Sequence, residues 1–456
     1  MDTSPIIEPL RELQLLRVLW CDNSNIIRTK GVFLPPMFEN ESDPNAIIDR
    51  INRAVTITAA SQSLPAIRDE PVLSTGLAPV LDIRLVPAWE TFSVCPQTPR
   101  IGTVIGDMVL KDQPWVHCPR HFLARMQQQL ETCGLHVELG FELEFYLFHQ
   151  ERDAKGELVP VDQCLYGASL AAQKSQSVIS DMLDALWAEG LPVAQYNPET
   201  GPGQHEISFD HDAPITTADR IVKARESIHA TALKHELIAS FVPMLYDEAT
   251  GNGMHTHFSL WSDGKNLLPD SDSRWGISET AEHFTAGVLE HLPALMAIST
   301  PSVNSFHRTQ PHEWSGAYQA WGVENKEAAL RMIRDTHDVQ VTHIELKTVD
   351  CAANPYLAFG GILATGMDGI ERQLALPDPV EVDPGNLTDA ERAERGIRRL
   401  PTSLDAAIER FKSDTSLKQA MGSEQAKVYA QIREAEFTMM QGMSLAEEAQ
   451  QLLERF

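Results

Sequence analysis

Residues 140–148 are Gly-Phe-Glu-Leu-Glu-Phe-Tyr-Leu-Phe, a segment in which apolar and acidic side chains alternate. On a β-strand successive side chains point to opposite faces, so the first Phe, Leu and Phe share one face and Glu142 and Glu144 share the other. Two carboxylates at this spacing repel each other and are costly to bury unpaired. Taken alone, the pattern favours a strand whose acidic face is open to water. The alternative is a cation held between the two carboxylates.

Further segments present the same kind of face, with chelating side chains on one side of a short apolar strand. These side chains are His255, His257 and Ser259, then His343, Glu345 and Lys347, and also Glu199 and Glu206 on either side of a Gly/Pro turn. One shared polar cavity explains several such faces better than several separate solvated strands do. Carboxylates with one or two imidazoles suit octahedral Mg²⁺ or Mn²⁺ rather than tetrahedral zinc.

Cation sites of this composition commonly hold transferring phosphoryl groups. The sequence has neither a GxxxxGK loop nor a GxGxxG after a strand, so a nucleotide would be bound in another way.

The composition narrows the class of protein. The chain has 456 residues, 64 acidic and 37 basic, for a formal charge of −27. The length predicts two domains, and the acidic balance disfavours nucleic acid and anionic membranes as partners. We see no signal peptide and no apolar run of about 18 residues. The six cysteines are scattered singly, which is typical of reduced, buried thiols. We therefore expect a cytoplasmic protein.

Hydrophobic patterning predicts the order of elements. Leu16–Leu19 and Ile26–Val32 are expected to form a hairpin, followed by a helix over Ala46–Ser61, two strands, and a domain boundary near residues 111–118. Beyond it we predict strands at Val137–Phe148, His205–Phe209, Met254–Trp261 and Val341–Thr348, and helices at His121–Leu130, Leu170–Glu189, Asp219–Leu237, Ser278–Ile298, Lys326–Met332, Pro355–Gln373 and within Ser403–Phe456.

Six segments, in this order along the chain, closely resemble the glutamine synthetase family. They are Gly140-Phe-Glu-Leu-Glu-Phe, Glu199-Thr-Gly-Pro-Gly-Gln-His-Glu206, Gly251-Asn-Gly-Met-His-Thr-His-Phe-Ser259, Pro301-Ser-Val-Asn-Ser-Phe-His-Arg308, Trp321-Gly-Val-Glu-Asn-Lys326, and His343-Ile-Glu-Leu-Lys347 continuing to Tyr356. The resemblance covers residues 135–370 best, and the first 110 residues match weakly.

The resemblance implies an α+β fold with a small N-terminal β-grasp domain, residues 1–112. A catalytic domain of a curved antiparallel sheet, or partial barrel, with helices would follow over residues 113–456. It also implies a homo-oligomer of stacked rings, a dodecamer in the family, with active sites between subunits. The implied reaction uses ATP and two or three Mg²⁺ or Mn²⁺ ions per site: the γ-carboxylate of L-glutamate is phosphorylated and then attacked by an amine.

The resemblance also assigns roles. Glu144, Glu199 and Glu206 would hold one divalent ion, and Glu142, His255 and Glu345 the second. Arg308 would pair with the substrate glutamate, near Gly251, Thr250 and Lys347. The nucleotide would be lined by His257, Ser259, Lys326, Arg331 (on the helix predicted at 326–332) and His343; among these residues Lys326, His343 and Lys347 stand where arginines are usual.

One departure concerns the amine. Ammonia-using members of the family carry a glutamate in a flap after the arginine, and here Trp314 stands at that position, with Glu313 one residue earlier. A large apolar ring cannot bind ammonium as a carboxylate does, but it can pack a carbon group. The resemblance gives Asp82 as the candidate that deprotonates the amine, with Glu313 in reserve.

We therefore expect a γ-glutamylamide synthetase that uses a small alkyl- or arylamine. True glutamine synthetase, a polyamine or ethanolamine ligase, and a catalytically silent structural relative remain alternatives. All six proposed ligand positions carry competent side chains, which argues against the silent relative.

Overall fold

The N-terminal part of the chain forms a sheet of its own. The computed structural model describes residues 4–39, 41–247, 249–337 and 339–456. The first sheet has the order β2 (Ile27–Phe33), β1 (Leu15–Cys21), β5 (Ile101–Leu110), β4 (Asp82–Val94) and β3 (Thr56–Thr58), with β6 (Gln113–Pro114) on β5. Only β1 and β5 run parallel. The hairpin predicted around residues 16–32 is confirmed as β1 and β2.

The turn of this hairpin is buried against the second half of the molecule. Asp22 accepts the backbone N–H groups of Ser24 and Ile26, and Asn25 lies in the left-handed region at φ 61°, which asparagine tolerates well. The Asn25 amide donates to the carbonyl of Cys351 at 2.9 Å. The turn therefore joins the two halves of the chain.

The helix predicted over Ala46–Ser61 is shorter in the structure. It is α3 (Pro44–Asn52), capped by Asp43 and buried through Ile47, Ile48 and Ile51. The residues after it form β3 and a 3-10 turn (Ala59–Ser63). The β-branched run Thr56-Ile-Thr58 pairs with β4, and tertiary pairing decides such a segment over helical spacing.

The second sheet has ten strands and provides most of the candidate site. Its order is β15 (Trp321–Val323), β16 (Leu330–Arg334), β17 (Val341–Leu346), β12 (Thr256–Ser262), β7 (His136–His149), β10 (Gln204–Asp212) and β9 (Val193–Pro198), with β8 (Val159–Pro160), β11 (Leu237–Ser240) and β13 (Lys265–Asn266) paired to its side. All neighbours are antiparallel except β15 and β16. The four strands predicted from alternation are confirmed, and so is the α+β class.

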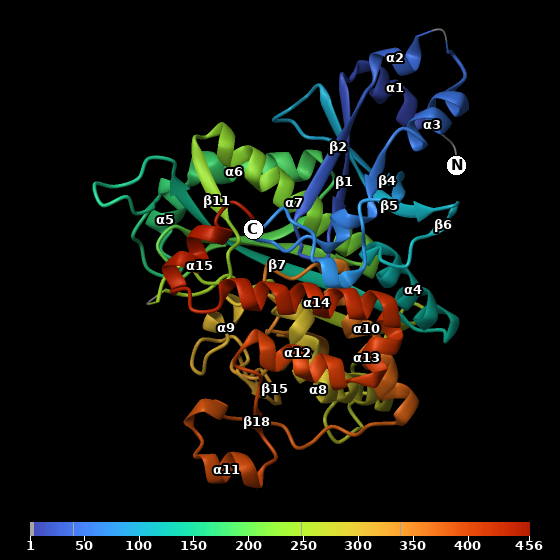
Figure 1. Cartoon of the computed structure of the whole chain (residues 1–456). Coiled ribbons are helices and arrows are strands. Elements are labelled where there is room, and N and C mark those ends of the chain that lie inside the picture. The colour runs from blue at the N-terminus through green and yellow to red at the C-terminus, as the bar shows by residue number, and fades with distance from the viewer. Residues whose placement is uncertain (1–3, 40, 248, 338) are drawn as a thin grey trace.

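Helices surround this sheet in Figure 1. The longest are α4 (Pro119–Thr132), α7 (Pro214–Lys234), α8 (Glu279–Ser299), α10 (Pro355–Arg372) and α14 (Ser423–Met440). Gly287 of α8 and Gly369 of α10 meet so closely that a Cβ on either would lie about 2.1–2.2 Å from a backbone oxygen. Only glycine permits this helix crossing.

Shorter helices complete the chain. They are α1 (Ser4–Glu12), α2 (Pro35–Phe38), α5 (Ser169–Lys174), α6 (Gln176–Ala188), α9 (Ser305–Arg308), α11 (Asp389–Glu394), α12 (Leu404–Ser413), α13 (Thr415–Met421) and α15 (Leu445–Leu452). The single helix predicted over Leu170–Glu189 is thus two helices that meet at Ser175.

The helix predicted over Lys326–Met332 is wrong. Lys326 lies in the turn after β15, and Arg331 is on strand β16. Leu330 and Met332 are buried while Arg331 points the other way. This is the period-two pattern of a strand, and two alanines before it imitate helical composition.

The six cysteines are free thiols. Four of them are buried as expected, whereas Cys164 is half-buried and Cys133 is exposed, so the prediction of a buried thiol is wrong for Cys133. Over the described ranges, we find no helix with the length and apolarity that crossing a membrane requires.

Candidate active site

Strand register brings three carboxylates together. Glu206 on β10 is directly opposite Glu144 on β7, and Glu142 is two residues further along β7 on the same face. Glu199, just after β9, is close enough to Glu144 and Glu142 for their charges to raise its pKa. The alternation of β7 and the Gly/Pro turn before β10 therefore place these groups on one face, as the sequence predicted.

The strands on the other side of β7 add imidazoles and a further carboxylate. His257 on β12 is directly opposite Glu345 on β17, and His255 immediately precedes β12. His255 Nδ1 lies 3.1 Å from Glu142, 3.5 Å from Glu345 and 3.8 Å from Glu144. His257 Nε2 lies 3.3 Å from Glu142. All six predicted ligands thus converge.

The carboxylates carry strongly shifted pKa values. Burial, followed by the charges of Glu142 and Glu144, raises the pKa of Glu206 far above its usual range. Burial and Glu144 raise the pKa of Glu199 to about 7. Burial also opposes ionisation of Glu142, but His255 and His257 hold its pKa well below the ordinary value. Too little positive charge therefore faces the cluster on the side of Glu199 and Glu206.

These residues fit divalent cations. The donor atoms of Glu142, His257 and Glu345 lie within 4.8 Å of one another, and the buried Nε2 of His257 faces the Glu142 carboxylate at 3.3 Å. Oxygen-rich clusters of this kind suit Mg²⁺ and Mn²⁺. His257, which we expected only beside the nucleotide, is therefore as well placed for a cation as His255.

A cation should stabilise the protein more as the pH rises. The folded-state pKa of Glu199 is raised, so its contribution to metal-free stability is complete below about pH 4.5 and is lost as the pH passes about 7. In EDTA we expect the melting temperature to fall between about pH 5.5 and pH 8 relative to a sample with Mn²⁺. Differential scanning fluorimetry measures this gap. A gap that narrows with rising pH would contradict the prediction.

Arg308 lies at the end of α9 and is buried beside the cluster. Its Nη2 donates to the carbonyl of Lys347 at 3.0 Å and contacts Nε2 of His255 at 3.1 Å. Lys347 in turn donates to Glu345 at 2.7 Å. A Cβ at Gly251 would lie 2.7 Å from Cγ of Arg308. The structure therefore brings Arg308, Gly251 and Lys347 together.

The residues predicted for the nucleotide follow the same strands. Arg331 on β16 donates to Glu345 at 3.3 Å and to Glu324 at 2.7 Å. The His343 ring lies 5.2 Å from that of His257, and burial lowers the pKa of His343 to about 4. Ser259 is buried on β12. All four nucleotide candidates on β12, β16 and β17 therefore lie near Glu345 or one strand away from it.

The predicted amine-side residues are more dispersed. Trp314 lies in an exposed turn at φ 51° with half of its surface accessible, and Nζ of Lys326 lies 4.8 Å from the centre of its ring. Glu313 is exposed beside it. Asp82 is exposed at the start of β4 in the other sheet, and no hydrogen bond or ion pair found among the described residues joins it to the cluster. The structure of one chain therefore does not bring Asp82 to this site.

Sequence reasoning missed two residues. The pKa of Tyr166 is raised first by the charge of Glu199, then by burial and by the charges of Glu206 and Glu142, so this exposed phenol lies at the edge of the cluster. Glu327 accepts the backbone N–H of Trp314 at 3.2 Å. Tyr166 and Glu327 lie in irregular segments, where periodicity gives no signal. For Glu327 the available signal was an acidic residue directly after Asn325-Lys326.

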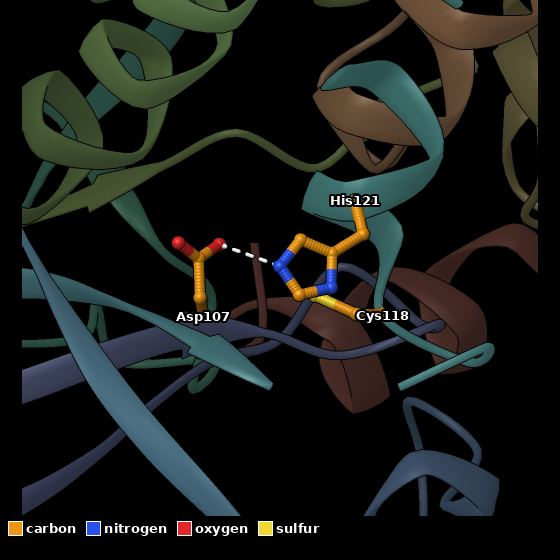
Figure 2. A group of neighbouring side chains, drawn as sticks. All are labelled: Asp107, Cys118 and His121. Carbon is orange, nitrogen blue, oxygen red and sulfur yellow. Dashed lines mark ion pairs between the residues drawn. The ribbon is translucent and has the colours of Figure 1, made fainter. Parts of the chain in front are cut away.

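A second group of potential ligands is a structural cluster. Asp107, Cys118 and His121 meet where α4 begins, with His121 Nε2 3.4 Å from Asp107 (Figure 2). Both Asp107 oxygens already accept from Arg120, at 2.9 and 3.0 Å. Burial raises the pKa of Cys118 to about 12, and the start of a helix disfavours a cation. We therefore assign no metal to this group.

Comparisons with known proteins identify the family of this chain. The glutamine synthetase catalytic domain matches residues 116–451. A gamma-glutamylpolyamine synthetase, GlnA3, of Streptomyces coelicolor is 33% identical over 87% of this chain and 88% of its own. A glutamine synthetase of Thermococcus kodakarensis is 36% identical over 71% of each chain. The solved structure of a GmaS/ADP complex is 25% identical, covers 99% of both chains and superposes with a TM-score of 0.82.

Fold, site and matches define an ATP-dependent ligase that forms carbon–nitrogen bonds. The chain belongs to the glutamine synthetase family. Enzymes of this family use ATP and divalent metal ions.

Proposed function

We propose that this enzyme joins the γ-carboxylate of L-glutamate to an organic amine, as a γ-glutamylamide synthetase that converts ATP to ADP and phosphate. The observation that carries the proposal is Trp314. Its half-exposed ring stands beside Lys326, at the position where ammonia-using relatives offer a carboxylate. An aromatic surface favours a carbon group over ammonium. The similarity to a gamma-glutamylpolyamine synthetase supports an organic amine.

Roles for the site residues follow from their positions. Glu144, Glu199 and Glu206 would hold one cation, and Glu142, Glu345 and His255 the other, with His257 adjacent. Bound divalent cations would neutralise the ATP phosphates and the transferring phosphoryl group. The glutamate side would be formed by Arg308, Gly251, Thr250 and Lys347, and the nucleotide side by His257, Ser259, Lys326, Arg331 and His343.

The arrangement of chains is part of the same proposal. We assign residues 1–112 to a β-grasp domain and residues 113–456 to the catalytic domain, in a cytoplasmic ring-shaped homo-oligomer. Asp82 is exposed on the N-terminal sheet, so it would reach the amine only in the active site of a neighbouring copy. Glu313 is the alternative residue for deprotonating the amine within the same chain.

True glutamine synthetase is the second candidate. The 36% identity to the enzyme of Thermococcus kodakarensis favours it, because it implies that a similar site suffices for ammonia. In that case Trp314 would be tolerated without a role in choosing the amine.

Phosphate release with glutamate, ATP, Mn²⁺ and a panel of amines separates the two candidates. We expect alkylamines or arylamines to be used with a kcat/KM at least tenfold above that of ammonium. The variant Trp314→Glu should improve ammonium use by about tenfold and reduce organic-amine use, since it restores a carboxylate and removes the apolar ring. Val382→Glu is a control for added charge, because Val382 is exposed and its carbonyl accepts from the side chain of Asn325 in the turn beside Trp314. Robust turnover with ammonium alone in the parent enzyme would overturn the proposal.

A further inference from the structure

The turn that carries Trp314 rests on the turn between β15 and β16. Glu327 Oε1 accepts the backbone N–H of Trp314 at 3.2 Å, and Nζ of Lys326 lies over the Trp314 ring. Asn325 holds this second turn, because its side-chain oxygen accepts the N–H of Glu327 at 3.0 Å and its amide donates to the carbonyl of Val380 at 2.7 Å. The Glu327 carboxylate is therefore fixed beside the backbone of Trp314.

Charged groups on three segments face Glu327. Burial raises the pKa of this carboxyl, the N–H of Trp314 opposes that shift, Asp383 adds to it, and His312 and Lys347 lower it. Lys347 also donates to Glu345, so Glu327 is within electrostatic reach of the cation cluster. His312 is paired with Asp383 at 2.6 Å, which leaves Glu327 half-buried without an ion pair among the described residues.

The proposed reaction needs a proton acceptor at this place. An alkylamine with a pKa of about 10 arrives as an ammonium ion whose nitrogen has no free electron pair. Trp314 cannot accept a proton, Glu313 is exposed, and Asp82 lies on the first sheet, from which it could reach this place only in a neighbouring copy. Resting on the proposed function, we infer that Glu327 is the catalytic residue that takes this proton, and that the enzyme therefore prefers aliphatic amines, which are protonated at neutral pH.

The step balances as follows. One N–H bond of the ammonium breaks and the proton passes to Glu327, which becomes a neutral carboxylic acid. The freed electron pair attacks the γ-carbonyl carbon of the acyl phosphate and forms the C–N bond. The C–O bond to phosphate breaks, its electron pair leaves with the phosphate, and the second proton of the attacking nitrogen goes to that phosphate. Glu327 then returns its proton to water.

Two nucleophiles separate this role from a structural one. Hydroxylamine is neutral near pH 7.5 and needs no acceptor before it attacks, whereas an alkylamine does. Glu327→Gln keeps an oxygen that can accept the N–H of Trp314. We expect this variant to lose about 10²-fold in kcat/KM with the alkylamine, and to stay within about twofold of the parent with hydroxylamine. Glu381→Gln, an exposed change of the same charge on the adjacent segment, should leave both unchanged.

The pH dependence of kcat/KM separates loss of a proton acceptor from a mere loosening of the Trp314 turn. In Glu327→Gln the alkylamine kcat/KM should rise tenfold per pH unit towards the pKa of the amine, because only free base reacts; Glu327→Asp should recover part of the loss. Equal losses with both nucleophiles, or no loss with the alkylamine, would overturn the role of Glu327. A parent enzyme inactive with hydroxylamine and every amine would instead overturn the proposed function.

Discussion

Glu345→Gln is expected to lower glutamate- and ATP-dependent turnover by about a thousandfold. Glu345 is almost fully buried and faces His255 on one side and Lys347 on the other, at 3.5 and 2.7 Å. Lys347, followed by the two histidines, outweighs burial and holds the pKa of Glu345 to about 2, so a full negative charge is available to a cation. Glutamine keeps the shape and removes that charge.

Equilibrium binding of Mn²⁺, followed by calorimetry, should show the same loss as turnover. The matched control is Glu371→Gln on the exposed side of α10, which removes one negative charge from a residue outside the cluster. Melting curves show whether the variant is folded. A folded Glu345→Gln enzyme that binds Mn²⁺ and turns over as the parent does would remove Glu345 from the cation site.

Arg120→Met is expected to destabilise the protein by about 3–5 kcal/mol. Arg120 is the first residue of α4 after its proline, and its side chain is 11% exposed. It donates to Asp107 of β5 and Asp219 of α7 at 2.8–3.0 Å, and Asp219 also accepts from Tyr356 of α10 at 2.7 Å. Methionine keeps much of the apolar volume but leaves Asp219 buried without its cation.

Urea denaturation gives the shift of the midpoint for this variant. Arg53→Met is the control, because the Arg53–Asp49 pair is 69% and 59% exposed and should contribute less than about 1 kcal/mol. Equal midpoint shifts for the two variants would mean that the Arg120 network does not hold the first sheet against the helices.

The strands and the grouping of the carboxylates with the imidazoles were predictable because their signal is local and periodic. Alternation along residues 140–148 fixes which face Glu142 and Glu144 share, whatever the partner strands are. Antiparallel pairing of β12 with β17 then allows few registers, and the register in the structure places His257 opposite Glu345. Recurrence of chelating residues on several strands is informative because burying each face separately would be costly.

The rest depended on contacts that periodicity does not encode. Arg331 was assigned to a helix because Ala328 and Ala329 favour helices in isolation, while pairing with β17 decides the structure. Glu327 was missed because its position beside Trp314 depends on one hydrogen bond between two turns, which sequence patterns do not predict. Asp82 could be chosen only by resemblance, and one chain leaves it on the other sheet.

The pairing of Glu206 with Glu144 across β10 and β7 serves the proposed cation site but lowers the stability of the metal-free protein. Burial and the neighbouring carboxylates raise the pKa of Glu206 far above its usual range, so this carboxyl makes the metal-free protein less stable. Replacing it with a neutral side chain should therefore stabilise the metal-free form. Selection for heat resistance without metal would therefore favour Glu206→Gln, a change that gives up a proposed cation ligand. A screen that selects variants of this enzyme by melting temperature alone would therefore select against a proposed cation ligand, unless the screen is run with the metal bound.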